Sequence, residues 1–370
     1  MAKLPGMKTP AEAEATLAPY GYDAATQARF AARAAQAVSN AVTGELAPLA
    51  PGAIAQLPAL GTPERARLRD AGLAMIAAGK VGVVILAGGM ATRFGGVVKA
   101  VVPAHDDKSF LELKVADARA VAAHAGGTVP VLVMSSFSTH EDIVAHIADK
   151  QLGPIDVFPQ FVALRLAPDG ALFRTDDGAL SPYATGHGDL PFALVRSGAL
   201  ARFRAAGGTT LLMSNVDNLA ATLDPALVAM HAELGGAITA EVVRKVPGDK
   251  GGAPALYAGR PQIIEGFRFP DAFDQDRIEV FNTNTFFLDA DMIAREVELP
   301  YYRVEKQVDG KPAIQFERLV GELTAHVPSR FIEVPRVEED CRFLPAKDPA
   351  ELARNVPQIA RVTASTRWKR

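Results

Sequence analysis

The sequence predicts an α/β fold in which helices cover an open, mainly parallel sheet. First, short apolar runs rich in β-branched residues recur from Val81 onward, each of strand length. Second, amphipathic segments such as STHEDIVAHI lie between several of these runs, and Ser138 and Glu141 have the spacing of a capping box. The runs that we predict as strands are VGVVIL (81–86), PVLVMSS (130–136), TTLLMSN (209–215), AITAEVV (237–243) and FNTNTFFL (281–288).

A helical extension is expected before these strands, over residues 1–79. Asp23 fits the N-cap of a helix, and Thr62 with Pro63 fits the start of a second helix that ends near Gly79. We place the main α/β domain at 80–350, and we expect residues 351–370 to form a short C-terminal tail that ends in the basic and polar STRWKR. The apolar residues spaced by four after Asp23, as one helical face requires, are Phe30, Ala34, Val38 and Val42.

Composition excludes several classes of protein. The net charge of -3 over 370 residues offers no general attraction to nucleic acid or to an anionic membrane, so neither is expected as a partner. No apolar stretch approaches the roughly 20 residues of a membrane span. The single cysteine, Cys341, excludes an intramolecular disulfide and a cysteine-based zinc site. We therefore expect a cytoplasmic protein that acts on small molecules.

The segment VVILAGGMATRFGG (83–96) predicts a loop that binds a phosphate chain. Gly88 and Gly89 let the backbone approach a ligand, and the following turn can aim N–H groups at negative oxygens. The loop lacks the Lys-Ser/Thr pair of a P-loop and does not match the dinucleotide fingerprint. It offers amides, then Arg93, then Lys99. The alternative is a tight strand-to-helix turn with solvated basic residues.

Polar residues in two further segments suit a sugar phosphate and a metal ion. His187 lies between two glycines, where its ring can project toward a hydroxyl or a phosphate, although it could equally pack in a turn. Asn215 and Asp217 follow a predicted strand, and ligands of open α/β sheets bind beyond the carboxyl ends of strands. A carboxylate there is a suitable Mg²⁺ ligand, while capping a helix is the other use of such a residue.

The remaining candidate residues could be either functional or structural, depending on the surrounding fold. Glu265 ends a short predicted strand, where it could accept hydrogen bonds from sugar hydroxyls. Asn282 and Asn284 share one face if the chain is extended, although asparagine is also common in turns. In EVVRKVPGDKGG (241–252) we interpret the cations as solvated and only the glycine pair as functional. Lys347, taken alone, is best interpreted as a solvated surface residue.

The order of these motifs resembles the UTP-glucose-1-phosphate uridylyltransferase family, also called UDP-glucose pyrophosphorylases, of the eukaryotic-like type. The resemblance implies a Rossmann-like nucleotidyltransferase with a central mixed, mainly parallel sheet. Members of this family make UDP-glucose and pyrophosphate from UTP and glucose 1-phosphate with Mg²⁺. The motifs that carry the resemblance, from Val81 to Lys347, are LAGGMATRFGG, VLVMSSFSTHED, VFPQ, GHGD, MSNVDNLAAT, VVRKVPGDKGG, IIEGF, FNTNTFF, AIQFERLVG and VPRVEEDCRFLPAK.

The resemblance also implies a role for each candidate residue. Asp217 would hold Mg²⁺. The catalytic residues would be Lys99, Lys347 and Arg93, and the residues that bind the nucleotide would be Gly88, Gly89, Gln160 and Gly188. Those that bind the sugar phosphate would be His187, Asn215, Gly252, Glu265, Asn282 and Asn284. In-line attack on the α-phosphorus of UTP agrees with this set, because it requires positioning and charge compensation and no covalent enzyme nucleophile.

The sequence also departs from the family pattern. The first loop is one residue shorter and ends in Val-Val-Lys where the family has Gly-Pro-Lys, FPQ replaces Asn-Gln-Ser, and YATGHGD lacks prolines. The family's C-terminal β-helix domain is not seen, so we expect a monomer or an assembly through another surface. Two alternatives stay open: a pyrophosphorylase with a different or broader sugar 1-phosphate, and a non-catalytic nucleotide-sugar sensor.

Overall fold

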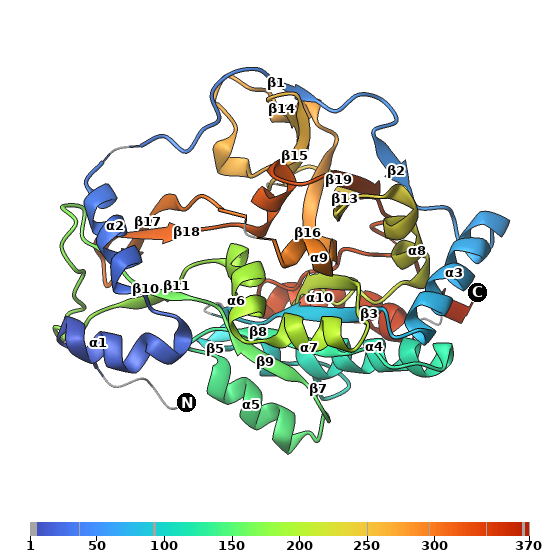
Figure 1. Cartoon of the computed structure of the whole chain (residues 1–370), viewed down its shortest axis with the longest axis horizontal. Helices are drawn as coiled ribbons and strands as arrows, with labels where there is room; N and C mark the ends of the chain where they lie inside the picture. Colours follow the sequence, from blue (N-terminus) through green and yellow to red (C-terminus); the bar gives the residue numbers. More distant parts are fainter. Residues whose placement is uncertain are drawn as a thin grey trace.

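The computed structural model describes residues 6–36, 38–91, 94–249, 251–295, 297–337, 339–364 and 367–369. At its centre lies an eight-stranded sheet (Figure 1). Within this sheet β16 alone runs antiparallel to its neighbours, so the predicted mixed, mainly parallel sheet is confirmed. Across the sheet the strands are β2 (Ile54–Gln56), β19 (Ser329–Glu333), β13 (Ile238–Arg244), β16 (Val280–Asp289), β12 (Thr210–Asn215), β3 (Val81–Leu86), β8 (Val131–Ser135) and β9 (Asp156–Pro159).

Helices cover both faces of the sheet because its central strands are apolar on both sides. In β3, Val83 and Ile85 belong to one buried cluster, and Val84 and Leu86 belong to the other. The first cluster is completed by α3 (Pro63–Ala77), α4 (Phe110–Ala125), α5 (His140–Asp149), α8 (Pro225–Leu234) and α10 (Pro349–Ala364). The second is completed by α6 (Leu190–Arg196), α7 (Ala199–Ala205), α9 (Ala290–Ile293), β14 (Ala253–Tyr257) and β15 (Arg260–Ile264).

Smaller elements surround this core. Two short helices precede the sheet, α1 (Pro10–Leu17) and α2 (Ala24–Ala34), and lie at the left of Figure 1. The antiparallel pairs outside the sheet are β10 (Val162–Leu164) with β11 (Pro182–Ala184), β17 (Tyr302–Val308) with β18 (Lys311–Glu317), β4 (Met90–Ala91) with β5 (Val97–Val98), and β6 (Pro103–His105) with β7 (Lys108–Ser109). Among the described residues, no helix combines the length and the apolar character of a membrane span.

The five predicted strands are confirmed as β3, β8, β12, β13 and β16, and two predicted helix starts are confirmed. The Asp23 carboxylate caps α2, and the Thr62 hydroxyl caps α3. The capping box at Ser138 and Glu141 is wrong: α5 begins at His140, after Thr139. The Thr139 hydroxyl bonds instead to the Ser136 N–H and the Ala87 carbonyl, which ties the start of α5 to the loop after β3.

The ends of the chain differ from the expected helical extension and tail. The helix α2 ends at Ala34, so Val38 is not on its apolar face and is 51% exposed. Further on, β1 (Leu46–Pro48) pairs with β14, and β2 joins the central sheet beside β19. The expected tail is the helix α10, which buries Ile359 and Val362. The domain limits 1–79, 80–350 and 351–370 stay a prediction.

A glycine in α3 sets how closely this helix can approach α8. A Cβ atom at Gly72 would lie 1.8 Å from the Pro225 carbonyl oxygen. In most helix interiors Gly→Ala stabilises by up to about 1 kcal/mol, but here the methyl group overlaps backbone atoms. We therefore predict that Gly72→Ala lowers the free energy of unfolding by roughly 1–3 kcal/mol, as overpacking does.

Urea denaturation of the two proteins would measure this difference. The exposed neighbour Ala71, changed to glycine, provides a control that reports helix propensity without the steric overlap. A stability gain in Gly72→Ala would contradict the close packing of α3 on α8.

Candidate active site

A cavity of about 550 Å³ opens beyond the carboxyl ends of β3, β8 and β12. This is the edge of an open α/β sheet at which ligands bind. Eight of the predicted site residues line this cavity: Gly88, Gly89, Lys99, Gln160, His187, Asn215, Asp217 and Lys347. They come from segments more than 250 residues apart in the chain. Arg93 lies outside the described residues.

One side of the cavity is built from a glycine loop and a glutamine. A Cβ atom at Gly88 would lie 2.4 Å from Nε2 of Gln160, so only glycine lets the amide lie this close to the loop. No described atom lies within 4 Å of a Cβ placed at Gly89. The loop therefore presents unobstructed backbone, and Gln160 adds a side-chain donor and acceptor.

Another part of the cavity lining carries His187 on a tight turn. Gly186 has a φ of 101°, and a Cβ at this position would lie 2.4 Å from the Arg318 carbonyl oxygen. A Cβ at Gly188 would lie 2.4 Å from the backbone nitrogen of Leu319. The Gly188 N–H donates to the Arg318 carbonyl at 2.9 Å, behind the cavity wall. These contacts give Gly188 a packing role, and its predicted contact with the nucleotide stays a prediction.

The His187 ring is neutral and has a defined tautomer. Its Nδ1 accepts a hydrogen bond from the Val320 N–H at 3.1 Å. Burial lowers the pKa of His187 to about 4, so at neutral pH its only ring proton is on Nε2. The imidazole can therefore donate one hydrogen bond to a ligand in the cavity, and it brings no positive charge.

A buried ion pair fixes the turn that carries His187. The guanidinium of Arg318 donates to the carboxylate of Asp189, which is fully buried. The same carboxylate accepts from the Thr185 hydroxyl at 2.6 Å and from the Phe161 N–H at 3.0 Å. Sequence analysis did not assign a role to Asp189 or Arg318, although both lie in motifs of the family resemblance, GHGD and AIQFERLVG.

Asn215 joins the cavity to a β-bulge in β16. Between Glu241 and Val242 of β13 the pairing jumps from Thr285 to Asn282, so two residues of β16 are inserted. Asn284 then has a φ of 58°, so the chain is not extended there, and the condition under which Asn282 and Asn284 would share one face is not met. Instead, Asn284 donates from Nδ2 to Oδ1 of Asn215 at 2.9 Å, and its N–H donates to Oδ1 of Asn282 at 3.1 Å.

The chain of contacts continues from Asn282 to Gly252 and Glu265. The Asn282 N–H donates to the Gly252 carbonyl at 2.8 Å. A Cβ at Gly252 would lie 2.9 Å from Oε2 of Glu265. Burial and the nearby Glu322 raise the pKa of Glu265 to about 7, against the opposite effect of Arg268. Asn284, Asn282, Gly252 and Glu265 thus form a connected series of contacts behind Asn215, and they do not themselves line the cavity.

The floor of the cavity concentrates lysines around one carboxylate. Nζ of Lys99 lies 4.0 Å from Oδ2 of Asp217 and donates to the Ala346 carbonyl. Burial raises the pKa of Asp217, while Lys99, Lys114 and Lys347 act against this rise. Lys99 therefore lines the cavity despite the shorter loop, and Lys347 is exposed in the same cavity. This arrangement suits a polyanion together with a cation.

Lys114 is a residue that sequence analysis did not single out. Its Nζ donates to the Ser214 hydroxyl at 2.7 Å, to the Asn218 carbonyl at 3.3 Å and to the Ala221 carbonyl. Burial lowers its pKa to about 8. Lys114 thus holds the loop after β12 in place beneath Asp217.

Comparisons with known proteins point to one family. The family model described as "UTP--glucose-1-phosphate uridylyltransferase" matches residues 29–364. A uridylyltransferase of that name from Solanum tuberosum is 30% identical over 293 residues, which cover 74% of this chain and 60% of that protein. UTP-glucose-1-phosphate uridylyltransferase 2 from Dictyostelium discoideum is 29% identical, over 74% of this chain and 58% of that protein. The chain spans about three fifths of the length of such curated relatives.

Solved structures share the fold. A UDP-glucose phosphorylase from Trypanosoma brucei superposes with a TM-score of 0.70 at 22% identity, over 89% of this chain and 73% of that one. A mutant UDP-glucose pyrophosphorylase from Leishmania major gives a TM-score of 0.70 at 21% identity, with the same coverage. Because the family model extends over most of the sequence, this chain belongs to the UTP-glucose-1-phosphate uridylyltransferase family.

Proposed function

We propose that this protein forms UDP-glucose and pyrophosphate from UTP and glucose 1-phosphate. The observation that carries the proposal is that Lys99, Asp217 and Lys347 converge on one cavity. Such a cavity suits two anionic reactants, because cations offset phosphate charge and a carboxylate can bind a divalent ion. Membership in the family supports the same activity.

The two sides of the cavity would bind the two reactants. We place the uracil and ribose of UTP against Gly88, Gly89 and Gln160, where the backbone is unobstructed and an amide offers both a donor and an acceptor. We place glucose 1-phosphate beside His187 and Asn215. The Nε2–H of His187 would donate to it, and the other residues of this side would be Asn284, Asn282, Gly252 and Glu265.

Mg²⁺ is the cofactor that we propose, with Asp217 as its protein ligand. The Asp217 carboxylate is the group of the cavity wall that fits a hard cation, and its desolvation is a cost that a bound cation would relieve. The described residues contain no group of three or more His, Cys, Asp or Glu placed to hold a metal. Mg²⁺ is often bound by one or two carboxylates together with substrate phosphates. When bound, it would offset the charge of those phosphates.

The chemical step would be in-line displacement at the α-phosphorus of UTP. A phosphate oxygen of glucose 1-phosphate forms a bond to this phosphorus, and the bond to the oxygen that bridges to the β-phosphate breaks. Pyrophosphate leaves with the electron pair of that bond. We propose that Lys99 and Lys347 stabilise the negative charge that develops, together with Arg93 from the loop before Lys99.

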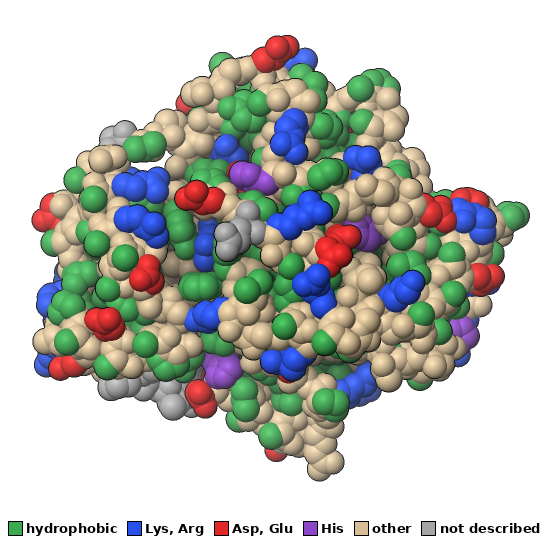
Figure 2. All heavy atoms as spheres, viewed as in Figure 1, with side chains coloured by type: hydrophobic (Ala, Val, Ile, Leu, Met, Phe, Trp, Pro, Cys, Tyr) green, Lys and Arg blue, Asp and Glu red, His purple; other side chains and the backbone are tan. Residues whose placement is uncertain are grey.

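On the face shown in Figure 2, the charges do not point to a macromolecular partner. Lys and Arg are interspersed with Asp and Glu over the face shown in Figure 2. Anionic substrates would therefore be attracted by the local cluster of lysines in the cavity. We propose a cytoplasmic location in carbohydrate metabolism, supported by the single cysteine, Cys341, which is buried and rules out an intramolecular disulfide. We propose a monomer, or an assembly that does not use a β-helix domain.

Pyrophosphate release tests the proposed function directly. The purified protein is given UTP and Mg²⁺ with glucose 1-phosphate, galactose 1-phosphate or N-acetylglucosamine 1-phosphate in separate reactions. We expect fast release with glucose 1-phosphate. Pyrophosphate release only with another sugar 1-phosphate would support the same reaction with a different substrate. Binding of UDP-glucose without pyrophosphate release in any reaction would favour the non-catalytic nucleotide-sugar sensor.

The two cavity lysines give the next prediction. Lys99→Ala and Lys347→Ala should each lower kcat on the order of 10²-fold, as loss of one donor to the transition state typically does. Lys306→Ala, on β17 and outside the cavity, is a matched control for the loss of one lysine. An unchanged kcat in either cavity variant would remove that lysine from the mechanism.

Asp217→Asn should weaken the response to Mg²⁺. The amide keeps the size of the side chain but loses the charge that attracts the ion. Titration of activity with MgCl₂ should need a higher concentration for half-maximal rate in the variant than in the wild type. Coincident titration curves for the two proteins would exclude Asp217 as a ligand.

A further inference from the structure

Asn218 links the loop after β12 to the segment that carries Lys347. It follows Asp217 directly and is 1% exposed. Its Nδ2 donates to the Arg342 carbonyl at 3.2 Å, and its Oδ1 accepts from the Leu344 N–H at 2.8 Å. One side-chain amide thus forms the two hydrogen bonds that a neighbouring strand would form. The backbone of Asn218 also forms an isolated bridge with Pro345.

The segment 342–344, which Asn218 holds, is followed by residues that are fixed by the helix α10. Just beyond it, the Lys347 N–H donates to the Glu351 carboxylate at 2.6 Å, and the Glu351 N–H donates to Asp348 at 2.7 Å. These bonds tie Lys347 to the first turn of α10. Nδ2 of Asn355 in the same helix donates to the Pro345 carbonyl at 3.1 Å. Lys347 therefore lies between two segments that are held by hydrogen bonds: residues 342–344, bonded to Asn218, and the start of α10.

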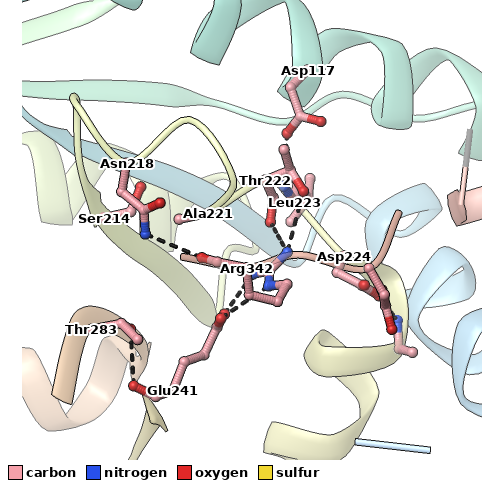
Figure 3. Close-up of polar contacts among 12 residues, drawn as sticks. Asp117, Ser214, Asn218, Ala221, Thr222, Leu223, Asp224, Glu241, Thr283 and Arg342 are labelled. Carbon is pink, nitrogen blue, oxygen red and sulfur yellow. Dashed lines mark hydrogen bonds and ion pairs between the residues drawn. The ribbon is translucent and has the colours of Figure 1, made fainter. Parts of the chain in front are cut away.

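Buried residues hold both ends of the two Asn218 hydrogen bonds in place. Nζ of Lys114 donates to the backbone carbonyl of Asn218. On the other side, the guanidinium of Arg342 forms a bidentate pair with Glu241 of β13, and neither side chain is exposed (Figure 3). In Figure 3 the side chain of Asn218 points toward the backbone of Arg342. Displacement of this amide would therefore be transmitted to the segment ahead of Lys347.

We propose that Asn218 is a positioning residue, which sets the place of Lys347 relative to Asp217 by holding residues 342–344. The proposal rests on the proposed function of Lys347 in uridylyl transfer. Asn218 does not line the cavity and touches no reacting group. It acts through the lysine, and a displacement of about 1 Å in a charged group can cost up to about 10²-fold in rate.

Asn218→Ala removes both hydrogen bonds and is the primary variant. We expect kcat to fall about 10-fold. The KM values for UTP and glucose 1-phosphate should change less than about 3-fold, because groups on the two binding sides of the cavity are untouched. Asn218→Ser, which is smaller and adds no charge beside Asp217, is a second variant for the case in which the alanine variant does not fold.

Gln27 supplies a matched control. Its side chain is also buried, and it also forms two hydrogen bonds to backbone, donating to the Leu164 carbonyl at 3.0 Å and accepting from the Leu164 N–H at 2.8 Å. It lies on α2 and does not line the cavity. Gln27→Ala should therefore lower the unfolding temperature as Asn218→Ala does and leave kcat close to that of the wild type.

A double-mutant cycle with Lys347→Ala separates positioning from general damage. If Asn218 acts through Lys347, Asn218→Ala should lower kcat about 10-fold in the wild type and less than about 2-fold when Lys347 is already alanine. Equal losses in both backgrounds, or a kcat for Asn218→Ala equal to that of Gln27→Ala, would overturn the proposal. A wild-type protein that releases no pyrophosphate would instead overturn the proposed function, before the cycle is begun.

Discussion

The ion pair between Arg342 and Glu241 joins the C-terminal part of the chain to the middle of the sheet. Both side chains are completely buried, and the guanidinium also donates to the Thr222 carbonyl at 2.8 Å. Removing two charges from water is costly and is offset only when geometry and extra hydrogen bonds are good. Because these conditions are met, residues 341–347 can cross the loop after β12 in one fixed position, and Lys347 reaches a cavity otherwise formed by residues 86–217.

The cavity combines close backbone approach with concentrated charge. At Gly88, Gly186 and Gly188 an added Cβ would overlap neighbouring atoms, so glycine allows two loops to stand closer together than other residues permit. The floor has the opposite character, because lysines with long side chains surround the desolvated Asp217. The walls thus supply shape and neutral hydrogen bonds, and the floor supplies charge.

Much of the fold could be predicted from local patterns, because apolar runs and capping residues act over a few residues. The strands around Val84 and Leu212 and the caps at Asp23 and Thr62 were predictable in this way. The strand β2 was not, since it has only three residues and pairs with β19 alone, at the edge of the sheet. The hydroxyl of Thr139 is committed to Ser136 and Ala87, which no local pattern reveals.

The site was predictable where a motif stands at the end of a strand, as for Gly88 and Asp217. Lys347 was assigned through the family resemblance, since a lone lysine near a proline has the appearance of ordinary surface. The left-handed Asn284 depends on a bulge that appears only when β13 and β16 are paired. The supporting residues Arg318, Lys114 and Asn218 act through partners 100 or more residues away.

The place of Lys347 in the chain has a consequence for biosynthesis. A ribosome makes the glycine loop, the histidine turn and Asp217 long before it makes the segment from Arg342 to α10. Contacts of such large sequence separation are slow to form, and the domain completes them late. A nascent chain of about 300 residues would therefore contain Lys99, Lys114 and Asp217 but not yet Lys347. The cavity gains Lys347 only after this segment has emerged, so its set of lysines is assembled later than its glycine loop and Asp217.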